Sequence, residues 1–297
     1  MLSLQIKPIN NAKDAAHYYF AKDNYYFTSE LSTQWQGESS IRLGLEGSVK
    51  QDELMRVLSG TLPNGTVIGR KTAEGELQHR GGYDLTFSAP KSVSYLALVG
   101  GHKELIDIHN QAVSKVLVTI EQHAAEARKQ GKTGMEYEKT DNLSFATINH
   151  DTSRERDPHL HTHALLMNLT ERSDGKWRAL ASDISRNHGT MEWVMDNKIF
   201  LGLIYRSELA VGLKEMGLEV AHTGDQHGLF EIKHFNADLL TFVSKRRTQI
   251  EDRVSTMQSD TVKAYDRATL DTRKSKQVNN SDELQQHWRQ ESALFGV

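Results

Sequence analysis

The chain has 297 residues and a formal net charge of −3, with 36 Lys and Arg against 39 Asp and Glu. Its length favours one large domain or two small ones, and a hydrophobic content of 37% is that of a folded chain rather than a disordered one. The absence of cysteine excludes disulfide scaffolds, thiolate metal sites and cysteine nucleophiles. No apolar run reaches the roughly 20 residues of a membrane span and no signal peptide opens the chain, so we expect a cytoplasmic protein without membrane insertion.

The first half of the chain predicts helices separated by one clear strand. Helical patterns cover residues 11–21 and 51–58, and residues 83–89 alternate apolar and polar side chains as a half-buried strand does. Residues 92–98 fit either a strand or a helix. Residues 102–129 carry the longest uninterrupted helical pattern, so we expect one long helix there.

The second half of the chain predicts a group of strands followed by helices. We expect strands at residues 134–139, 142–150 and 159–170, a helix at 191–216 and a hairpin of strands 218–222 and 228–232. From residue 235 onward the pattern is helical. Strands in the middle and helices at both ends predict an α+β fold with an antiparallel sheet and a helical C-terminal appendage.

The appendage is locally basic. Residues 241–280 contain nine Lys and Arg against five Asp and Glu, an excess of +4. The simplest interpretation is a solvated helical face; the alternative is a basic lid over an anionic ligand. The acidic total argues against a basic surface overall but leaves room for one local basic groove.

Four histidines gather at one expected hairpin, with His150 on its first strand and His159, His161 and His163 on its second. Residues at i and i+2 of a strand share a face, so the last three project together, and pairing across the loop 151–158 brings His150 to their level. Such convergence favours a metal site over isolated packing histidines. Three imidazoles leave coordination positions open, as catalytic metals require, and suit zinc, manganese, iron, nickel or copper. The spacing does not select three of the four.

Asp84 lies inside the expected strand 83–89, between apolar residues where a free carboxylate is costly. It is a candidate for the hydrogen bond that a ligating histidine makes through its second ring nitrogen. An outward-facing Asp on a half-buried strand is the other interpretation, and the alternation alone leaves both open.

Four of the nine tyrosines fall within nine residues, at Tyr18, Tyr19, Tyr25 and Tyr26. Packing aromatics at helical spacing are the simplest explanation. A tyrosine can also be a covalent nucleophile once a metal or a base activates its phenol, whose ordinary pKa is about 10. A tyrosine beside a metal-polarised phosphodiester makes a DNA transesterase, which conserves the bond energy as a phosphotyrosine.

Three segments, residues 18–26, 82–94 and 150–164, resemble in order and spacing the N-terminal relaxase domain of conjugative plasmid relaxases of the TraI/TrwC class. The match covers most of residues 1–235. The resemblance implies an HUH-type endonuclease fold, with a central antiparallel sheet between helices. It further implies a catalytic domain over residues 1–235 and a helical lid over residues 236–297 that closes on single-stranded DNA.

The activity implied by the resemblance is site- and strand-specific nicking at a plasmid origin of transfer, which leaves a 5′-phosphotyrosyl DNA and a free 3′-OH and is reversed when the strand is rejoined. The partners implied are that single-stranded DNA and accessory transfer proteins. The cofactor implied is a divalent metal ion, with magnesium or manganese expected first and zinc or nickel as other possibilities.

Motif position assigns roles to individual residues by resemblance. Tyr18 matches the first nucleophile, and Tyr19, Tyr25 and Tyr26 match companion tyrosines, one of which serves a second strand transfer. The metal triad is matched by His150, His161 and His163, and His159 is left out. Asp84 matches the acid that orients a metal-binding histidine or assists proton removal. The DNA-binding candidates are Arg154, which matches a basic position near the bound strand, and Trp177 and Arg178, which follow a turn.

Relaxases of this class usually continue into a helicase with a phosphate-binding loop. The nearest match here is Gly131-Lys132-Thr133, but Glu126 stands where that loop needs glycine and the preceding segment is expected to be helical. We therefore expect no NTP binding.

Two other functions compete with DNA nicking. A histidine-ligated metal oxygenase or hydrolase acting on a small molecule would also use a His-x-His pair, but it leaves the tyrosine pairs without a role. A non-enzymatic single-stranded DNA-binding module with a structural metal would bind DNA without forming a covalent adduct.

Overall fold

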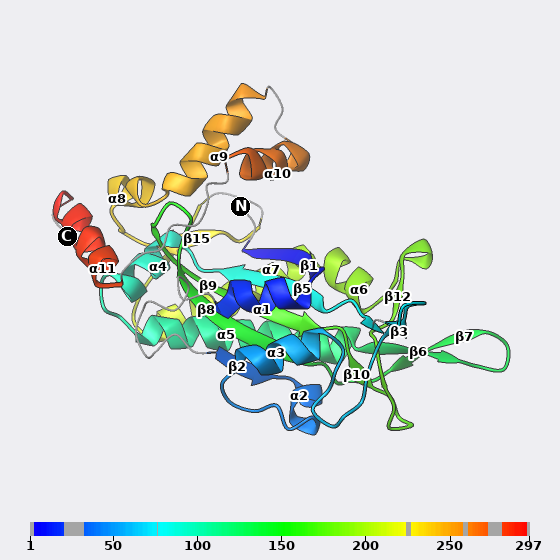
Figure 1. Ribbon diagram of the computed structural model, residues 1–297. Helices are drawn as coiled ribbons and strands as arrows, with labels where there is room; N and C mark the ends of the chain where they lie inside the picture. The colour runs from blue at the N-terminus through cyan, green and yellow to red at the C-terminus, as the bar shows by residue number, and fades with distance from the viewer. Residues whose placement is uncertain are drawn as a thin grey trace.

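An antiparallel sheet of five strands lies at the centre of the part of the chain that the structure describes (Figure 1). The computed structural model describes residues 3–20, 33–75, 77–223, 227–257, 261–272 and 281–295. The strand order is β1 (Leu4–Ile9), β5 (Gly82–Ser88), β9 (Pro158–Met167), β8 (Phe145–Thr152) and β2 (Thr33–Gln36). Only β8 and β9 are neighbours in both the sequence and the sheet, so the rest of the sheet depends on long-range pairing.

Each face of the sheet buries its own apolar core. On one face the sheet packs against α4 (Lys91–Leu98), α5 (Glu104–Ala124) and α7 (Lys198–Glu215). On the other face it packs against α1 (Ala12–Phe20) and α3 (Gln51–Leu58). Alternate residues of β8 and β9 supply the two cores, because side chains along a strand point to opposite faces. A helix–sheet–helix arrangement therefore covers both faces of the central strands.

Short elements surround the sheet. The remaining helices before the C-terminal segment are α2 (Glu38–Arg42), α6 (Thr190–Asp196) and the short 3-10 turn Ile184–Arg186. Five two-stranded ribbons are formed by β3 (Arg70–Lys71) with β4 (Leu77–Gln78), β6 (Glu126–Gln130) with β7 (Met135–Lys139), β10 (Thr170–Glu171) with β11 (Trp177–Arg178), β12 (Ser182–Asp183) with β13 (His188–Gly189), and β14 (Val220–His222) with β15 (Phe230–Ile232), counted within the described residues.

The C-terminal segment is helical, as expected. It contains α8 (Ala237–Phe242), α9 (Lys245–Thr256), α10 (Val262–Asp271) and α11 (Ser281–Ala293). Figure 1 shows α9 and α10 standing together above the sheet. The helix α11 returns to the main core, where Leu284 and Trp288 are each 1% exposed. Among the described helices, none has the length and apolar character of a membrane span.

The α+β class and the antiparallel sheet are confirmed, but several expected boundaries are wrong. The helix expected over residues 102–129 ends at Ala124, because Ala125 turns to an extended backbone and residues 126–130 pair with β7. The helix expected over 191–216 is interrupted at Asn197, where α6 ends and α7 begins. Residues 92–98 are helical.

The expected strands differ from the observed ones in their bounds and in their pairing. The strand expected over 142–150 begins at Phe145, and the strand expected over 159–170 ends at Met167. The strand 134–139 exists as β7 but pairs with β6, outside the central sheet. The sequence did not reveal β1 and β2, which are short and are held by their partners β5 and β8.

Gly82 tests the packing of the central strands. Its φ of +149° disfavours any L side chain, and a Cβ there would lie 2.0 Å from the Leu166 carbonyl oxygen in the neighbouring strand. We expect Gly82→Ala to lower the free energy of unfolding by about 3 kcal/mol, measured by urea denaturation.

Gly65 is the matched control, because its φ of +82° is also unfavourable but nothing lies within 4 Å of the added Cβ. Gly65→Ala should cost only about 1 kcal/mol, the backbone penalty alone. Equal losses in the two variants would show that the contact with β9 does not matter.

Candidate active site

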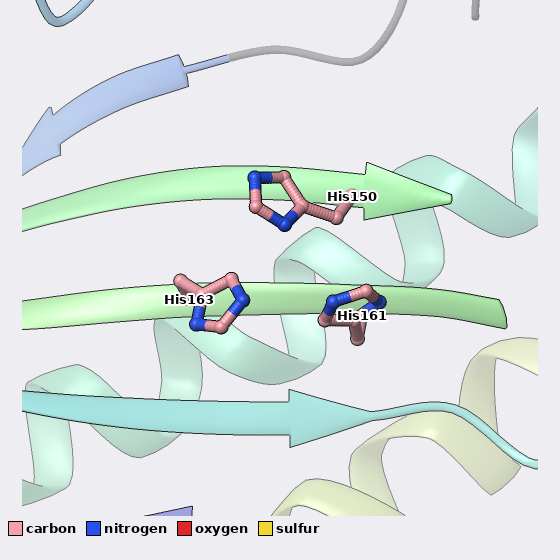
Figure 2. Close-up of side chains that lie close together, drawn as sticks. All are labelled: His150, His161 and His163. Atoms are coloured by element: carbon pink, nitrogen blue, oxygen red, sulfur yellow. The ribbon is translucent and has the colours of Figure 1, made fainter. Parts of the chain in front are cut away.

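Three histidines converge on the sheet face that lies towards α1. In the register of β8 and β9, His150 stands opposite His161, and His163 stands opposite Ile148, two residues further along. Figure 2 shows the three imidazoles turned towards one another from these adjacent strands. Their ring centroids are 4.7 to 5.3 Å apart, and one nitrogen from each lies within 4.8 Å of the others. This spacing suits a single metal ion.

Hydrogen bonds fix the rings of His161 and His163. The Nδ1 of His161 lies 2.8 Å from the carbonyl oxygen of His159, and the Nδ1 of His163 lies 2.8 Å from Oδ2 of Asp84. Both oxygens accept, so each Nδ1 carries the proton and each Nε2 keeps its lone pair for a ligand. This is the arrangement in which a histidine binds a metal.

Burial disfavours the protonated form of two histidines at the site. Burial and the neighbouring His163 lower the pKa of His161 to about 3. Burial also lowers the pKa of His159 well below its ordinary value. Metal binding requires deprotonated ligands, so the lowered pKa of His161 favours its binding to a divalent cation.

Asp84 is the carboxylate that holds this arrangement. Its side chain accepts hydrogen bonds from His163, from the Tyr19 hydroxyl at 2.9 Å and from the Thr86 hydroxyl at 3.1 Å. Burial acts to raise the pKa of Asp84, but the attraction of His163 and these hydrogen bonds outweigh it and lower the pKa. Asp84 therefore faces inward, and the outward-facing alternative is excluded.

The two tyrosines of α1 occupy different environments. Tyr19 is 5% exposed, and burial together with Asp84 raises the pKa of its phenol far above the ordinary value. Tyr18 is half-buried, lines the cleft, and has its ring centroid 6.2 Å from that of His163. Both tyrosines line the cleft, but Tyr19 is buried against Asp84 whereas Tyr18 is half-buried. Tyr25 and Tyr26 lie outside the described residues, so their roles stay predictions.

A cleft of about 570 Å³ surrounds Tyr18 and the histidines. Its cationic lining residues are Lys7, Arg154, Arg156 and Arg246. Arg246 comes from α9, and the cleft is also lined by Ile250 and by Thr269 of α10. The cleft is therefore bounded by the sheet on one side and by the C-terminal helices on another.

The DNA-binding candidates separate in the structure. Arg154 lines the cleft, and its DNA-binding role stays a prediction. Trp177 is 5% exposed and packs in the core beneath α1 and α3, so a base cannot stack on its ring without opening that core. The burial of Trp177 therefore does not support its expected role in binding DNA. Arg178 is exposed, but it does not line the cleft, and its role stays a prediction.

Two residues of the site escaped the sequence reading. Thr86 bonds Asp84 and also lies 3.2 Å from Nδ1 of His163. Its position two residues after Asp84 on one strand was the available signal, because such residues share a face. Lys7 stands opposite Asp84 on β1, a strand without a clear sequence pattern.

The segment that nearly matches a phosphate-binding loop in sequence does not have the geometry of such a loop. Gly131-Lys132-Thr133 form the turn between β6 and β7, closed by a bond from the Gly131 N–H to the Gly134 carbonyl. The preceding segment is a strand, contrary to the expected helix, but a strand also follows it, where a phosphate-binding loop is followed by a helix.

Comparisons with known proteins agree on one family. The TrwC relaxase family model matches residues 12–295. Two relatives named multifunctional conjugation protein TraI, from Escherichia coli and from its strain K12, are 40% and 39% identical over 98% and 97% of this chain. The chain spans 16% of the length of each.

Solved structures extend the comparison. The metal-bound structure of the conjugative relaxase TrwC in complex with oriT DNA is 32% identical, with a TM-score of 0.86 over 100% of this chain and 99% of that one. A copper-bound TrwC–oriT complex matches with the same identity, TM-score and coverage.

The role of Asp84 can be tested through metal binding. Asp84→Asn keeps the shape but removes the charge that accepts the His163 proton, so we expect Mn²⁺ to bind about 10- to 100-fold more weakly by isothermal titration calorimetry. Asp14→Asn removes a carboxylate that lines the same cleft without bonding a histidine, and it should bind Mn²⁺ nearly as the wild type does. Equal affinities of the two variants would contradict the orienting role.

Proposed function

This chain belongs to the TrwC relaxase family, and we propose on that basis that it nicks one DNA strand at a plasmid origin of transfer and rejoins it by tyrosine transesterification. The observation that carries the proposal is that Tyr18, the three histidines and Asp84 meet at one cleft. A small-molecule hydrolase needs no tyrosine at the metal, and a structural metal needs no cleft beside it.

The proposed reaction is an exchange of one phosphodiester for another. The Tyr18 phenolic oxygen attacks the scissile phosphorus, the phosphorus–O3′ bond breaks, and the departing 3′ oxygen takes up a proton as the phenol loses one. The products are a 5′-phosphotyrosyl strand and a 3′-OH. Attack by that hydroxyl reverses the step, so no nucleotide triphosphate is consumed.

The histidine triad is proposed to hold a divalent cation. When bound, such a cation withdraws electron density from a phosphoryl oxygen and so favours attack on phosphorus. We propose magnesium or manganese, because they are abundant, with zinc or nickel also able to bind, since a site of imidazoles alone discriminates poorly between such ions. Support for a metal comes from the donor set and from metal-bound TrwC structures.

Asp84 and Tyr19 are proposed to position the site rather than to react. Asp84 contacts His163 directly, so its contribution is to hold the ring and its tautomer. The Tyr19 hydroxyl is occupied by the bond to Asp84 and resists ionisation. Tyr18 is thus the better nucleophile of the pair, which leaves Tyr25 and Tyr26 as the candidates for a second strand transfer.

Single-stranded DNA is proposed to enter the cleft past its cationic residues. Lys7, Arg154 and Arg156 line it and attract a phosphate backbone. Such a local groove is compatible with a net charge of −3. Accessory transfer proteins and a cytoplasmic site of action remain parts of the proposal, together with the absence of NTP binding.

We propose residues 236–297 as a lid over a catalytic domain of residues 1–235. Support comes from the cleft, which α9 and α10 help to line. The base of this lid is tied to the loop 153–157 between β8 and β9. The Trp288 Nε1–H donates to the Arg156 carbonyl at 2.6 Å, and Lys245 lies 3.9 Å from Asp157 and 2.6 Å from Glu291.

The nucleophile is tested by a covalent-adduct assay. End-labelled oligonucleotides that tile the transfer origin of the parent plasmid are mixed with the protein and Mg²⁺ or Mn²⁺ and resolved on a denaturing gel. We expect a protein-sized shift that is lost with EDTA and in Tyr18→Phe, since phenylalanine has no attacking oxygen, while DNA binding measured by fluorescence anisotropy is retained.

Tyr19→Phe is the matched control. It removes a hydroxyl from the same helix and should still form the adduct, at a reduced rate because Asp84 loses one donor. An adduct that persists in Tyr18→Phe and disappears in Tyr19→Phe would exchange the two roles. A wild-type protein that forms no adduct on any oligonucleotide would overturn the proposal.

The lid is tested by Trp288→Phe, which keeps an aromatic ring in the core, smaller than the indole, and removes the bond to Arg156. We expect single-stranded DNA to dissociate about five- to ten-fold faster in stopped-flow experiments, as the loss of one hydrogen bond implies. Trp193→Phe, on α6 and stacked on His123, makes the same replacement away from the lid and should leave the rate unchanged. Equal rates in both variants would remove this support for a lid.

A further inference from the structure

The face of the β8–β9 hairpin that points away from the cleft carries a buried polar chain. His109 of α5 is fully buried and bonds the Tyr205 hydroxyl through Nδ1 and the Thr162 hydroxyl through Nε2, both at 2.7 Å. The Thr162 hydroxyl donates to Oδ1 of Asn149 at 3.1 Å, and the Asn149 amide donates to Oδ1 of Asn110 at 2.8 Å. This chain joins α7, α5, β9 and β8.

The number of protons that each side chain can donate decides which group donates and which accepts along this chain of hydrogen bonds. Thr162 has one hydroxyl proton, which it gives to Asn149, so it must accept from the Nε2–H of His109. The Nδ1 of a neutral His109 then accepts from Tyr205. Burial lowers the pKa of His109 to about 3, in agreement with a neutral ring. Each of these groups is satisfied, as buried polar groups need to be.

The chain lies directly behind the metal-binding histidines. Asn149 and Thr162 are register partners, and the pair stands between the two levels at which the histidines project from the opposite face. Thr162 separates His161 from His163, and Asn149 precedes His150. The side-chain bond between Thr162 and Asn149 therefore crosses from β9 to β8 at the level where the relative position of the three ligands is set.

Packing of the apolar core alone does not require this chain of hydrogen-bonded side chains. The surroundings on this face are apolar, with Phe87, Leu160 and Ala164 fully buried in the same core. Buried polar groups cost stability unless they are paired, and aliphatic side chains in a core can slide more easily than a directional chain of hydrogen bonds. The chain therefore adds a geometric restraint that ordinary packing would not supply.

We propose that His109 and Thr162 are positioning residues, which hold β8 and β9 at the register and separation that metal binding by His150, His161 and His163 requires. Neither residue reaches the cleft; they act through the strands. The inference rests on the metal-binding role proposed for the histidine triad, and it adds to that role a support on the opposite face of the sheet.

The test compares Co²⁺ binding by the full chain in three variants, followed through the visible absorption spectrum of the bound ion. Thr162→Val removes the hydroxyl and keeps the shape. We expect about ten-fold weaker Co²⁺ affinity and an altered spectrum, as for the loss of an outer partner of a metal ligand. Thr162→Ser restores the hydroxyl and should bind Co²⁺ within about two-fold of the wild type.

Tyr205→Phe is the matched control for stability. It removes a hydroxyl from the other end of the same chain, on α7, and should lower the melting temperature of the metal-free protein as Thr162→Val does, yet leave Co²⁺ binding unchanged. Thr162→Val with wild-type affinity and spectrum but a lowered melting temperature would overturn the proposal, because the chain would then serve stability alone. Equal losses of affinity in Thr162→Ser and Thr162→Val would overturn it too.

A further variant covers the case in which Thr162→Val does not fold. Asn110→Ala acts at the half-buried end of the chain and releases the Asn149 amide, so about three-fold weaker Co²⁺ binding is expected and unchanged binding would contradict the inference. A wild-type chain that binds no Co²⁺ would instead reject the metal role of the triad itself, and that result is distinct from the failure of any variant.

Discussion

The antiparallel register of β8 and β9 is the constraint on which the rest of this structure depends. It places His150 opposite His161 and, through the two-residue alternation of a strand, sends His163 to the same face. The intervening Thr162 is sent to the opposite face, onto α5. A slip of one residue between these strands would move the histidines of one strand away from those of the other. It would also point polar side chains into an apolar core. The arrangement of the histidines and the stability of the fold therefore depend on the same pairing.

Around this register, the side chains are divided between reaction and support. Asp84 accepts hydrogen bonds from His163, Tyr19 and Thr86. These bonds occupy most of its lone pairs, so the carboxylate serves to hold its neighbours in place. Tyr18 and Tyr19 both line the cleft, but successive residues of a helix point about 100° apart, so Tyr19 is buried against Asp84 while Tyr18 is half-buried. One helical turn thus supplies both the proposed positioning phenol and the proposed nucleophile.

Features that depend on residues close together in the sequence could be predicted, and features that depend on long-range contacts could not. The histidine cluster could be read from the sequence because its spacing and its hairpin are local, and so could the inward role of Asp84 once a family resemblance was added. Thr86 and Lys7 were missed, although the alternation of β5 pointed to the former. Trp177 was misjudged because whether its ring covers a core or meets solvent depends on how the β10–β11 ribbon folds back, a long-range event. The short strands β1 and β2 carry little pattern of their own and exist through their partners.

The loop between the two histidine strands connects the proposed metal site to the C-terminal helices that we propose as a lid. Its residues Arg154 and Arg156 line the cleft, while Asp157 and the Arg156 carbonyl receive Lys245 and Trp288 from the C-terminal helices. Asp157 is 1% exposed, and its carboxyl also bonds Ser153 within the loop, so the loop is closed by its own contacts as well as by the lid. Single-stranded DNA bound under α9 and α10, as proposed, would therefore contact the segment that joins His150 to His161. Opening the proposed lid and loosening the metal site should then be energetically linked, because both release the same loop.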